Sequence, residues 1–320
     1  MVVPVEVLEA DRKLLWGLCY RMTGNAADAE DLVQETFIRA LEHPPRLRDD
    51  SVRPWLIRVA INLSRDLLRR RRRRTYAGEW LPAPVPTDES DNIASYEPLS
   101  LAKDSPAARY DLIESISFAF LIALEALTPV QRAVLLLRDV FDYSTLETAD
   151  ALGITEANVK VHLHRARRRM QDYESKRATP GPRLTEMTRI ALERFMQCLS
   201  AGDTDGLERL LTEDAVSVSD GGGKVAAAIN PIYGRDKVIR LIRGLYEKTG
   251  DYLEISLRSL NGLPALVAEF PDAPPGVASL FTLHLEVDSE GKIRRVDTVV
   301  APDKLQALHP QKIDSPQIAS

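Results

Sequence analysis

The chain has 320 residues, 28% of them charged, and a formal net charge of −5 at pH 7. It contains no run of about 18 apolar residues and no basic start followed by an apolar stretch, so we expect neither a transmembrane helix nor a secretory signal. The two cysteines, Cys19 and Cys198, lie far apart, which argues against a disulfide framework or a zinc site and fits a reducing cytoplasm.

The charge is unevenly distributed along the chain. Residues 1–80 hold 15 Lys and Arg against 12 Asp and Glu, whereas residues 185–320 hold 15 against 20. Because fields between exposed charges are screened over roughly 10 Å, local basic clusters and not the total charge decide attraction to phosphates. The acidic total therefore does not exclude a nucleic-acid partner.

Residues 10–74 show helical spacing. A helix over about Asp28–Leu41 has one apolar face and one polar face, and the polar face carries Asp31, Gln34 and Glu35. A further helix starts near Pro54 and ends in the basic run Arg69–Arg74. By spacing alone the polar face is an ordinary solvated surface. The basic run is either a solvated helix end or a phosphate contact, and we favour the contact.

A Pro-rich acidic linker is predicted over residues 76–107, and it includes the WLPAP segment Trp80–Pro84. Helical patterning resumes over residues 108–177. Thr128 and Pro129 are typical of a helix start, and Gly153 predicts the turn of a helix-turn-helix. The second helix of that motif becomes steadily more basic, which suits the DNA major groove. Its exposed or capping candidates are Thr155, Asn158, Lys160, Val161, His162 and Arg165.

A short break over residues 178–184 precedes a region of different character. Residues 185–305 give two helices broken at Gly202 and then five short alternating strands, a pattern that predicts one α+β domain. We expect residues 306–320 to form a flexible tail.

With these parts in order, the chain resembles a bacterial sigma factor of the extracytoplasmic-function class. Thr23–Leu41 is similar to that family's core-polymerase-binding helices, Pro54–Arg74 to the segment that opens the minus-ten promoter element, and Leu127–Met170 to the domain that reads the minus-thirty-five element. Three such motifs in family order are far more specific than any one of them.

The C-terminal region resembles that of a subgroup with a fused SnoaL-like domain. WLPAP, DGGGK (Asp220–Lys224) and APDKL (Ala301–Leu305) are similar to its short signatures, although Ala301 stands where the subgroup usually has Asn. The fold class implied is multidomain: a helical bundle and a helix-turn-helix domain, both all-α, followed by a cone-shaped α+β barrel.

The resemblance also implies functional residues. On the core polymerase, the β′ clamp helices would meet Asp31, Gln34 and Glu35, and the β flap is a second partner element. The minus-ten DNA would meet Trp55, Asn62, Arg65, Arg69, Arg70, Arg71 and Arg72, although Trp55 is equally well a core residue. The minus-thirty-five DNA would meet the six helix-turn-helix candidates. The interdomain regulatory contacts implied are Trp80, Leu81, Pro82, Asp220, Gly221, Gly222, Gly223, Lys224, Pro302, Asp303, Lys304 and Leu305.

We therefore expect a cytoplasmic sigma factor that is regulated in cis by its C-terminal domain, with no catalytic residue, cofactor or metal and no need for a separate anti-sigma protein. One alternative is an active enzyme domain using Asp220, His284 or Asp297 for proton transfer. Another is a barrel cavity that senses a small molecule. A third is a DNA-binding repressor that acts without polymerase.

Overall fold

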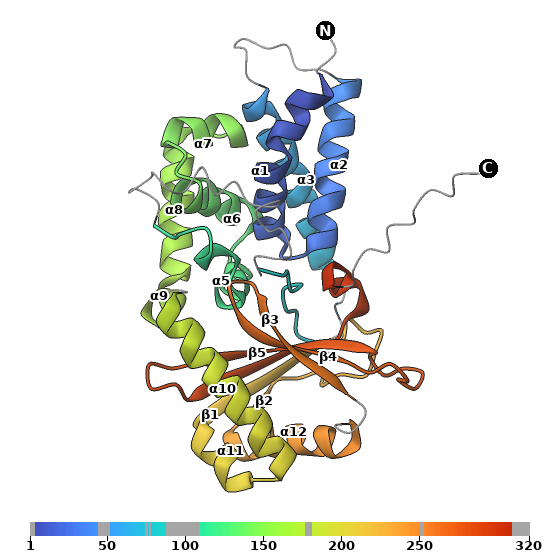
Figure 1. The fold of residues 1–320 in the computed structure, drawn as a ribbon. Helices are drawn as coiled ribbons and strands as arrows, with labels where there is room; N and C mark the ends of the chain where they lie inside the picture. The colour runs from blue at the N-terminus through green and yellow to red at the C-terminus, as the bar shows by residue number, and fades with distance from the viewer. Residues whose placement is uncertain are drawn as a thin grey trace, which may run out of the picture.

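Two helical regions lie side by side at one end of the molecule, and a sheet with its own helices lies at the other (Figure 1). The computed structural model describes residues 4–43, 52–73, 76, 78–87, 109–176, 181–249 and 253–308, without the side chains of Arg72 and Arg73. The predicted linker beyond residue 87 and the tail beyond residue 308 therefore lie outside the described residues. Within them, no helix is long and apolar enough to cross a membrane.

The first region is a three-helix bundle of α1 (Val5–Thr23), α2 (Ala26–Glu42) and α3 (Arg53–Arg73). Asn25 caps α2, since its side chain accepts hydrogen bonds from the backbone N–H groups of Ala27 and Asp28. The predicted apolar face of α2 is buried in the bundle, with Ala29 and Val33 both fully shielded from solvent.

The second region contains the predicted helix-turn-helix. Ser144 forms a capping box with Glu147, Gly153 ends the first helix at φ 63°, and Thr155 caps the second helix through the Asn158 N–H. Its elements are η3 (Glu114–Ile116), α5 (Phe118–Leu124), α6 (Pro129–Leu135), the π-helix η4 (Leu136–Val140), α7 (Thr145–Leu152), α8 (Glu156–Arg169) and α9 (Gln171–Lys176).

The two helical regions share one hydrophobic core, although the sequence predicts two separate domains. Helix α3 packs against both α6 and α7. Arg132, only 2% exposed, donates from Nη1 to the Met22 carbonyl oxygen at 2.7 Å and from Nη2 to that of Leu124 at 2.7 Å. A fully buried guanidinium needs such partners, and here one of them comes from the first region.

The C-terminal region is a six-stranded sheet in the order β2-β1-β6-β5-β4-β3, in which only the β1–β6 pair is parallel among the described strands. The α+β prediction is confirmed, but the sheet stays open, with β2 and β3 at its edges. Its elements are α10 (Pro182–Ala201), α11 (Thr204–Leu210), β1 (Leu211–Asp220), β2 (Ile232–Tyr233), α12 (Arg235–Thr249), β3 (Glu254–Leu260), β4 (Leu263–Glu269), β5 (Leu280–Val287), β6 (Ile293–Val299), η6 (Pro302–Lys304) and η7 (Gln306–Leu308).

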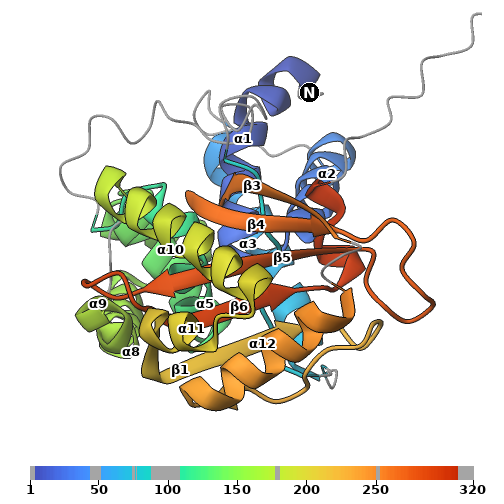
Figure 2. The ribbon, with the colours of Figure 1, turned by 60° about the horizontal axis from the view of Figure 1, so that its bottom comes forward.

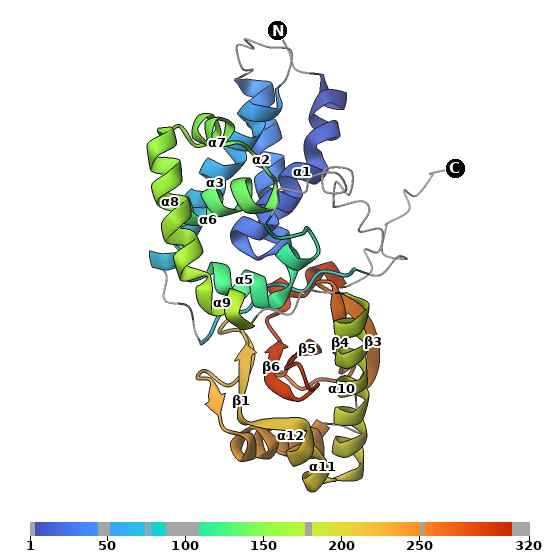
Figure 3. The same cartoon turned by 90° about the vertical axis from the view of Figure 1, so that its left-hand side faces the viewer.

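The two faces of this sheet have different partners. Helices α10, α11 and α12 cover one face, and the helical regions lie behind the other (Figure 2). Along β5, Leu283 and Leu285 point into the core formed with α10–α12, so Thr282 and His284 point to the opposite face. On that second face, Leu81 of the linker and Phe118 of α5 join a separate apolar cluster with strand residues such as Val267. Figure 3 shows α5 and α9 close above the strands.

Two sequence expectations fail here. The stretch between β2 and β3 was expected to contain only strands and turns, yet it forms helix α12, whose apolar face includes Val238 and Ile239. The tail was expected to begin at residue 306, yet Leu308 is buried in the apolar cluster with Leu81 and Phe118. Residues 306–308 are therefore part of the domain.

Candidate functional site

The linker crosses the junction between the three regions in an extended form and uses every second backbone N–H. Proline at 82, 84 and 86 has no N–H to satisfy and holds the backbone extended. The intervening N–H groups donate to different regions: Leu81 to Asp220 Oδ2 at 2.7 Å, Ala83 to the Gly24 oxygen at 2.8 Å and Val85 to Asn261 Oδ1 at 2.9 Å. Thr87 follows the same pattern to the Ser259 oxygen at 2.7 Å. An alternating Pro pattern thus lets a buried strand dock without unpaired donors.

A buried ion pair receives the start of this linker. Lys304 Nζ lies 2.6 Å from Asp220 Oδ2 and donates to the Leu81 oxygen at 2.6 Å. The Tyr76 hydroxyl donates to Asp220 Oδ1 at 2.6 Å, as does the Gly222 N–H at 3.0 Å. Burial lowers the pKa of Lys304 to about 8, against the opposing effect of Asp220. Burial and the bond to Asp220 raise the pKa of Tyr76 above its usual range.

Trp80 lies between two cations. Arg71 lies 4.4 Å from the centroid of its ring and the Lys304 ammonium also lies 4.4 Å from it. The ring also packs on Gly24, where a Cβ atom would come within 2.3 Å of it. Arg71 further donates to the Thr23 oxygen at 2.9 Å and pairs with Glu125 at 3.2 Å. Arg71, expected at minus-ten DNA, thus holds the junction together in this arrangement.

The predicted DGGGK and APDKL segments meet, with one difference from expectation. The backbone N–H groups of Val300 and Ala301 donate to the backbone carbonyl oxygen of Asp220 at 2.9 and 3.0 Å. Gly222 has a φ of 60°, and a Cβ there would lie 3.3 Å from the Ala301 methyl, which is a tight contact. Lys224 was expected to pair with a charge on the sigma domains, but it lies 3.4 Å from Asp303 of its own domain. Gly221 is buried, Gly223 adopts φ 73°, Pro302 is exposed, and Pro82 and Leu305 are buried.

Asn261 is the junction residue that sequence reasoning missed. It occupies the two-residue Asn261–Gly262 turn between β3 and β4 at φ 54°, and it is 2% exposed. Its Nδ2 donates to Tyr20 Oη at 2.7 Å and to the Ile116 oxygen at 2.7 Å, while its Oδ1 accepts from Val85. One side chain therefore links the sheet, the linker and both helical regions. The Asn-Gly pair signals a hairpin turn, but nothing local signals this docking.

The residues expected at polymerase and DNA are mostly at the surface. Asp31 and Gln34 are exposed on α2, and Glu35 bonds to Arg39 at 2.8 Å. On α8, Thr155, Asn158, Lys160, Val161 and Arg165 are exposed, and His162 is half-buried. On α3, Asn62, Arg69 and Arg70 are exposed, and Arg65 is half-buried. Trp55 is half-buried against the helical core, and the Arg72 side chain lies outside the described residues.

Helices α3 and α8, the two expected DNA-reading helices, belong to helical regions that share one hydrophobic core. Arg58 of α3 donates to the Asp150 oxygen of α7. Burial lowers the pKa of His162 on α8, and the nearby positive charges of Arg165 and of Arg65 on α3 lower it further. Arg58 and Arg65 of α3 therefore lie beside the helix-turn-helix, whereas Arg69 and Arg70 of the same helix stay exposed.

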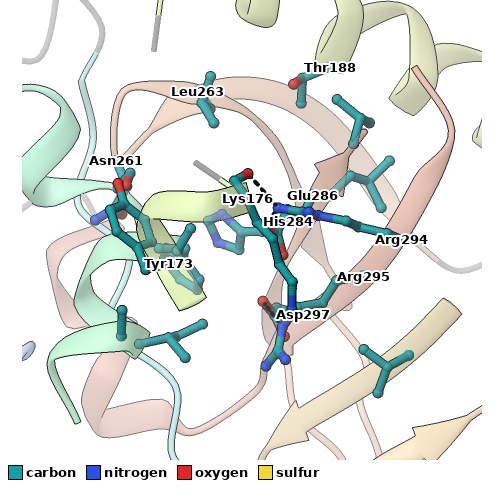
Figure 4. A pocket seen from close by; sticks show the side chains of 18 of the residues that line it. Tyr173, Lys176, Thr188, Asn261, Leu263, His284, Glu286, Arg294, Arg295 and Asp297 are labelled. Carbon is teal, nitrogen blue, oxygen red and sulfur yellow. Dashed lines mark hydrogen bonds and ion pairs between the residues drawn. The ribbon is translucent and has the colours of Figure 1, made fainter. Parts of the chain in front are cut away.

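A cavity of about 580 Å³ lies between the second helical region and the sheet (Figure 4). His284 and Asp297, which are partners on β5 and β6, line it, whereas Asp220 does not. Phe118 stacks on the His284 ring with centroids 3.8 Å apart, and Arg295 Nε holds both oxygens of Asp297 at 2.8 and 2.9 Å. Burial lowers the pKa of His284 to about 3 and raises that of Asp297 to about 6.

Comparison with known proteins identifies the two helical regions. Sigma-70 region 2 matches residues 7–74 and Sigma-70 region 4 matches residues 118–170. The ECF RNA polymerase sigma factor SigJ of Mycobacterium tuberculosis is 33% identical over 306 residues, which cover 94% of this chain and 92% of SigJ. The chain belongs to the ECF sigma factors.

Further similarities extend over all three regions. The crystal structure of Mycobacterium tuberculosis SigJ has a TM-score of 0.69 with this sigma factor at 30% identity and covers 94% of this chain and 98% of SigJ. The probable ECF sigma factor SigI of the same species is 28% identical over 93% of both chains. This sigma factor therefore binds RNA polymerase and promoter DNA, and it has helical regions 2 and 4 followed by a SnoaL-like domain.

Proposed function

We propose that the SnoaL-like domain regulates this sigma factor in cis by clamping regions 2 and 4 together in a closed form. The observation that carries the proposal is the direct packing of α3 against α6 and α7, with the linker and Asn261 bonded to both regions from the sheet side. The clamp residues are Trp80, Leu81, Asp220, Asn261 and Lys304.

The closed form does not fit a two-part promoter. The minus-ten and minus-thirty-five elements are about 25 base pairs apart, which at about 3.4 Å per base pair is about 85 Å of duplex. Packed helices have axes only about 10 Å apart. We infer that regions 2 and 4 separate before both elements are read, and that promoter reading then uses the exposed candidates on α3 and α8.

The closed form leaves the expected polymerase-binding face of α2 accessible. Asp31 and Gln34 stay exposed while the clamp is in place. We propose that the β′ subunit binds this face first and that the β flap then competes for region 4. On this proposal the SnoaL-like domain replaces a separate anti-sigma protein, because it already packs against α5 and α9 of region 4.

Leu81 offers a direct test, because it is 1% exposed in the cluster on the sheet. Leu81→Asp places a charge there and should open the clamp, so we expect more core-polymerase binding and more run-off transcript than with the unchanged chain. Leu257→Asp is the matched control, because Leu257 is 46% exposed on β3. Equal or lower transcription by Leu81→Asp at unchanged protein concentration would contradict a closed inhibited form.

We propose regulation and not catalysis for the SnoaL-like domain. The His284 ring is covered by Phe118, and the Asp297 carboxylate is already held by Arg295. Both groups that reach the cavity are therefore occupied by neighbours at the positions where a proton-transfer substrate would approach.

A further inference from the structure

The cavity between region 4 and the sheet has walls from two parts of the chain. Region 4 contributes Phe118 and Ile122 from α5, Ala126 from the turn after it, and Tyr173 and Lys176 from α9. The sheet side contributes β5 and β6, and α10 contributes Thr188 at the rim (Figure 4). The cavity therefore exists in this form only while region 4 is docked.

The charges around the cavity balance and are largely paired with one another. The lining contains four basic residues and four acidic residues. Arg295 pairs with Asp297 at 2.8 Å, Lys176 pairs with Asp172 at 2.9 Å, and Arg294 pairs with Glu286. An added ion would meet no excess of opposite charge and would lose hydration on entry, which disfavours charged ligands.

What remains for a ligand is an apolar wall with a few neutral polar groups. Phe118, Ile122, Leu263 and other aliphatic residues form the wall. The His284 imidazole is stacked on Phe118 and its Nε2 lies 3.1 Å from the Thr282 hydroxyl; it is neutral near pH 7, because burial lowers its pKa to about 3, and so it adds no charge to the lining. The Thr188 hydroxyl is buried beside the cavity without a hydrogen-bond partner. Ligand pockets of drug-sized molecules have this volume and this kind of lining.

We propose that this interdomain cavity binds a neutral, largely apolar small molecule with one or two hydrogen-bonding groups, and that the ligand locks the closed form. A ligand that touches both walls binds the closed form better than the open one and must shift the equilibrium toward it. The effect on transcription rests on the proposed clamp, whereas binding itself does not.

The test uses two fluorescent probes with the same aromatic skeleton. N-phenyl-1-naphthylamine is neutral, and its sulfonated relative 8-anilinonaphthalene-1-sulfonate is anionic. We expect the full chain to bind the neutral probe with enhanced, blue-shifted fluorescence and to bind the anion more weakly. No saturable binding of the neutral probe, or tighter binding of the anion, would overturn the proposal.

Variants on each wall locate the probe. Ala126→Phe fills the cavity from region 4, where Ala126 is exposed, and should weaken binding roughly tenfold. Thr188→Val keeps the side-chain volume but removes the hydroxyl and should weaken binding about threefold. Ala157→Phe adds the same ring to an exposed alanine of α8 outside the cavity and should change nothing. Unchanged binding by Ala126→Phe would exclude a site shared between the two walls.

The effect of the bound probe on the closed form is measured separately, through core-polymerase binding. The neutral probe should lower core-polymerase binding by the unchanged chain and leave binding by Leu81→Asp unaltered. If the probe binds as above but does not change polymerase binding by either chain, the locking half of the proposal fails. The clamp itself is judged separately, by the probe-free comparison of Leu81→Asp with the unchanged chain.

Discussion

Replacing Asn261 with glycine tests the clamp without disturbing the fold of the sheet. Glycine accepts the φ of 54° at this turn, so Asn261→Gly removes the side chain without backbone strain. Three hydrogen bonds of 2.7–2.9 Å disappear, to Tyr20, Ile116 and Val85. At about 1 kcal/mol each, their loss favours the open form by about 3 kcal/mol, or about 150-fold in the equilibrium.

The assay is energy transfer between dyes on region 2 and on the SnoaL-like domain. Glu42→Cys and Arg240→Cys are exposed labelling sites, used with Cys198→Ser so that the remaining Cys19 is buried. We expect Asn261→Gly to lower the transfer efficiency. Asn230→Gly, at an exposed loop position, is the control and should leave it unchanged. Equal efficiency in Asn261→Gly and the unchanged chain would refute the view that this side chain holds the regions together.

Three further predictions follow from the same junction and from the cavity. Gly24→Ala combines a strained φ of 65° with a clash against Trp80, so we expect a lower urea midpoint and altered tryptophan fluorescence. Asp220→Ala leaves the buried Lys304 charge unpaired and should destabilise the chain by about 3–5 kcal/mol in urea unfolding, a loss that the added change Lys304→Met largely restores. Because the pKa of His284 is about 3 when folded and about 6.5 when unfolded, the unfolded chain binds more protons between these values and stability falls as the pH falls through that window. Between pH 7 and 4.5 this group alone removes about 2.5 kcal/mol, so the stability advantage over His284→Gln should shrink by that amount, and a constant difference would contradict the buried neutral imidazole.

The sequence predicted helices well where their ends are set by residues within a few positions of each other. The helix-turn-helix follows from caps at Ser144 and Thr155 and from Gly153, all of which act within a few residues. Helix α12 was missed although Val238, Ile242 and Tyr246 recur every four residues, because the surrounding turn residues suggested strands.

The junction was predicted as motifs but not as geometry. Asp220, Lys304 and Leu81 were expected at interdomain contacts; in the structure Asp220 and Lys304 pair with each other and both bond the linker at Leu81. Lys224 pairs with Asp303 of its own domain instead of with a charge on the sigma domains. Arg71 packs on Trp80 in this arrangement, and its contact with minus-ten DNA stays a prediction. Asn261 gave no signal, since its role depends on Tyr20 and Ile116, which are distant in sequence.

The alternating prolines of the linker have a consequence for how this segment tolerates insertions. Pro-rich connections ordinarily accept extra residues, since little depends on their register. Here the donors at 81, 83, 85 and 87 each meet a fixed acceptor, and the residues between them have no N–H to offer. One inserted residue after Leu81 would bring a proline to every downstream acceptor and leave those oxygens unpaired, whereas two inserted residues of the same pattern would restore the match. This Pro-rich segment is therefore expected to tolerate insertions of two residues and not of one.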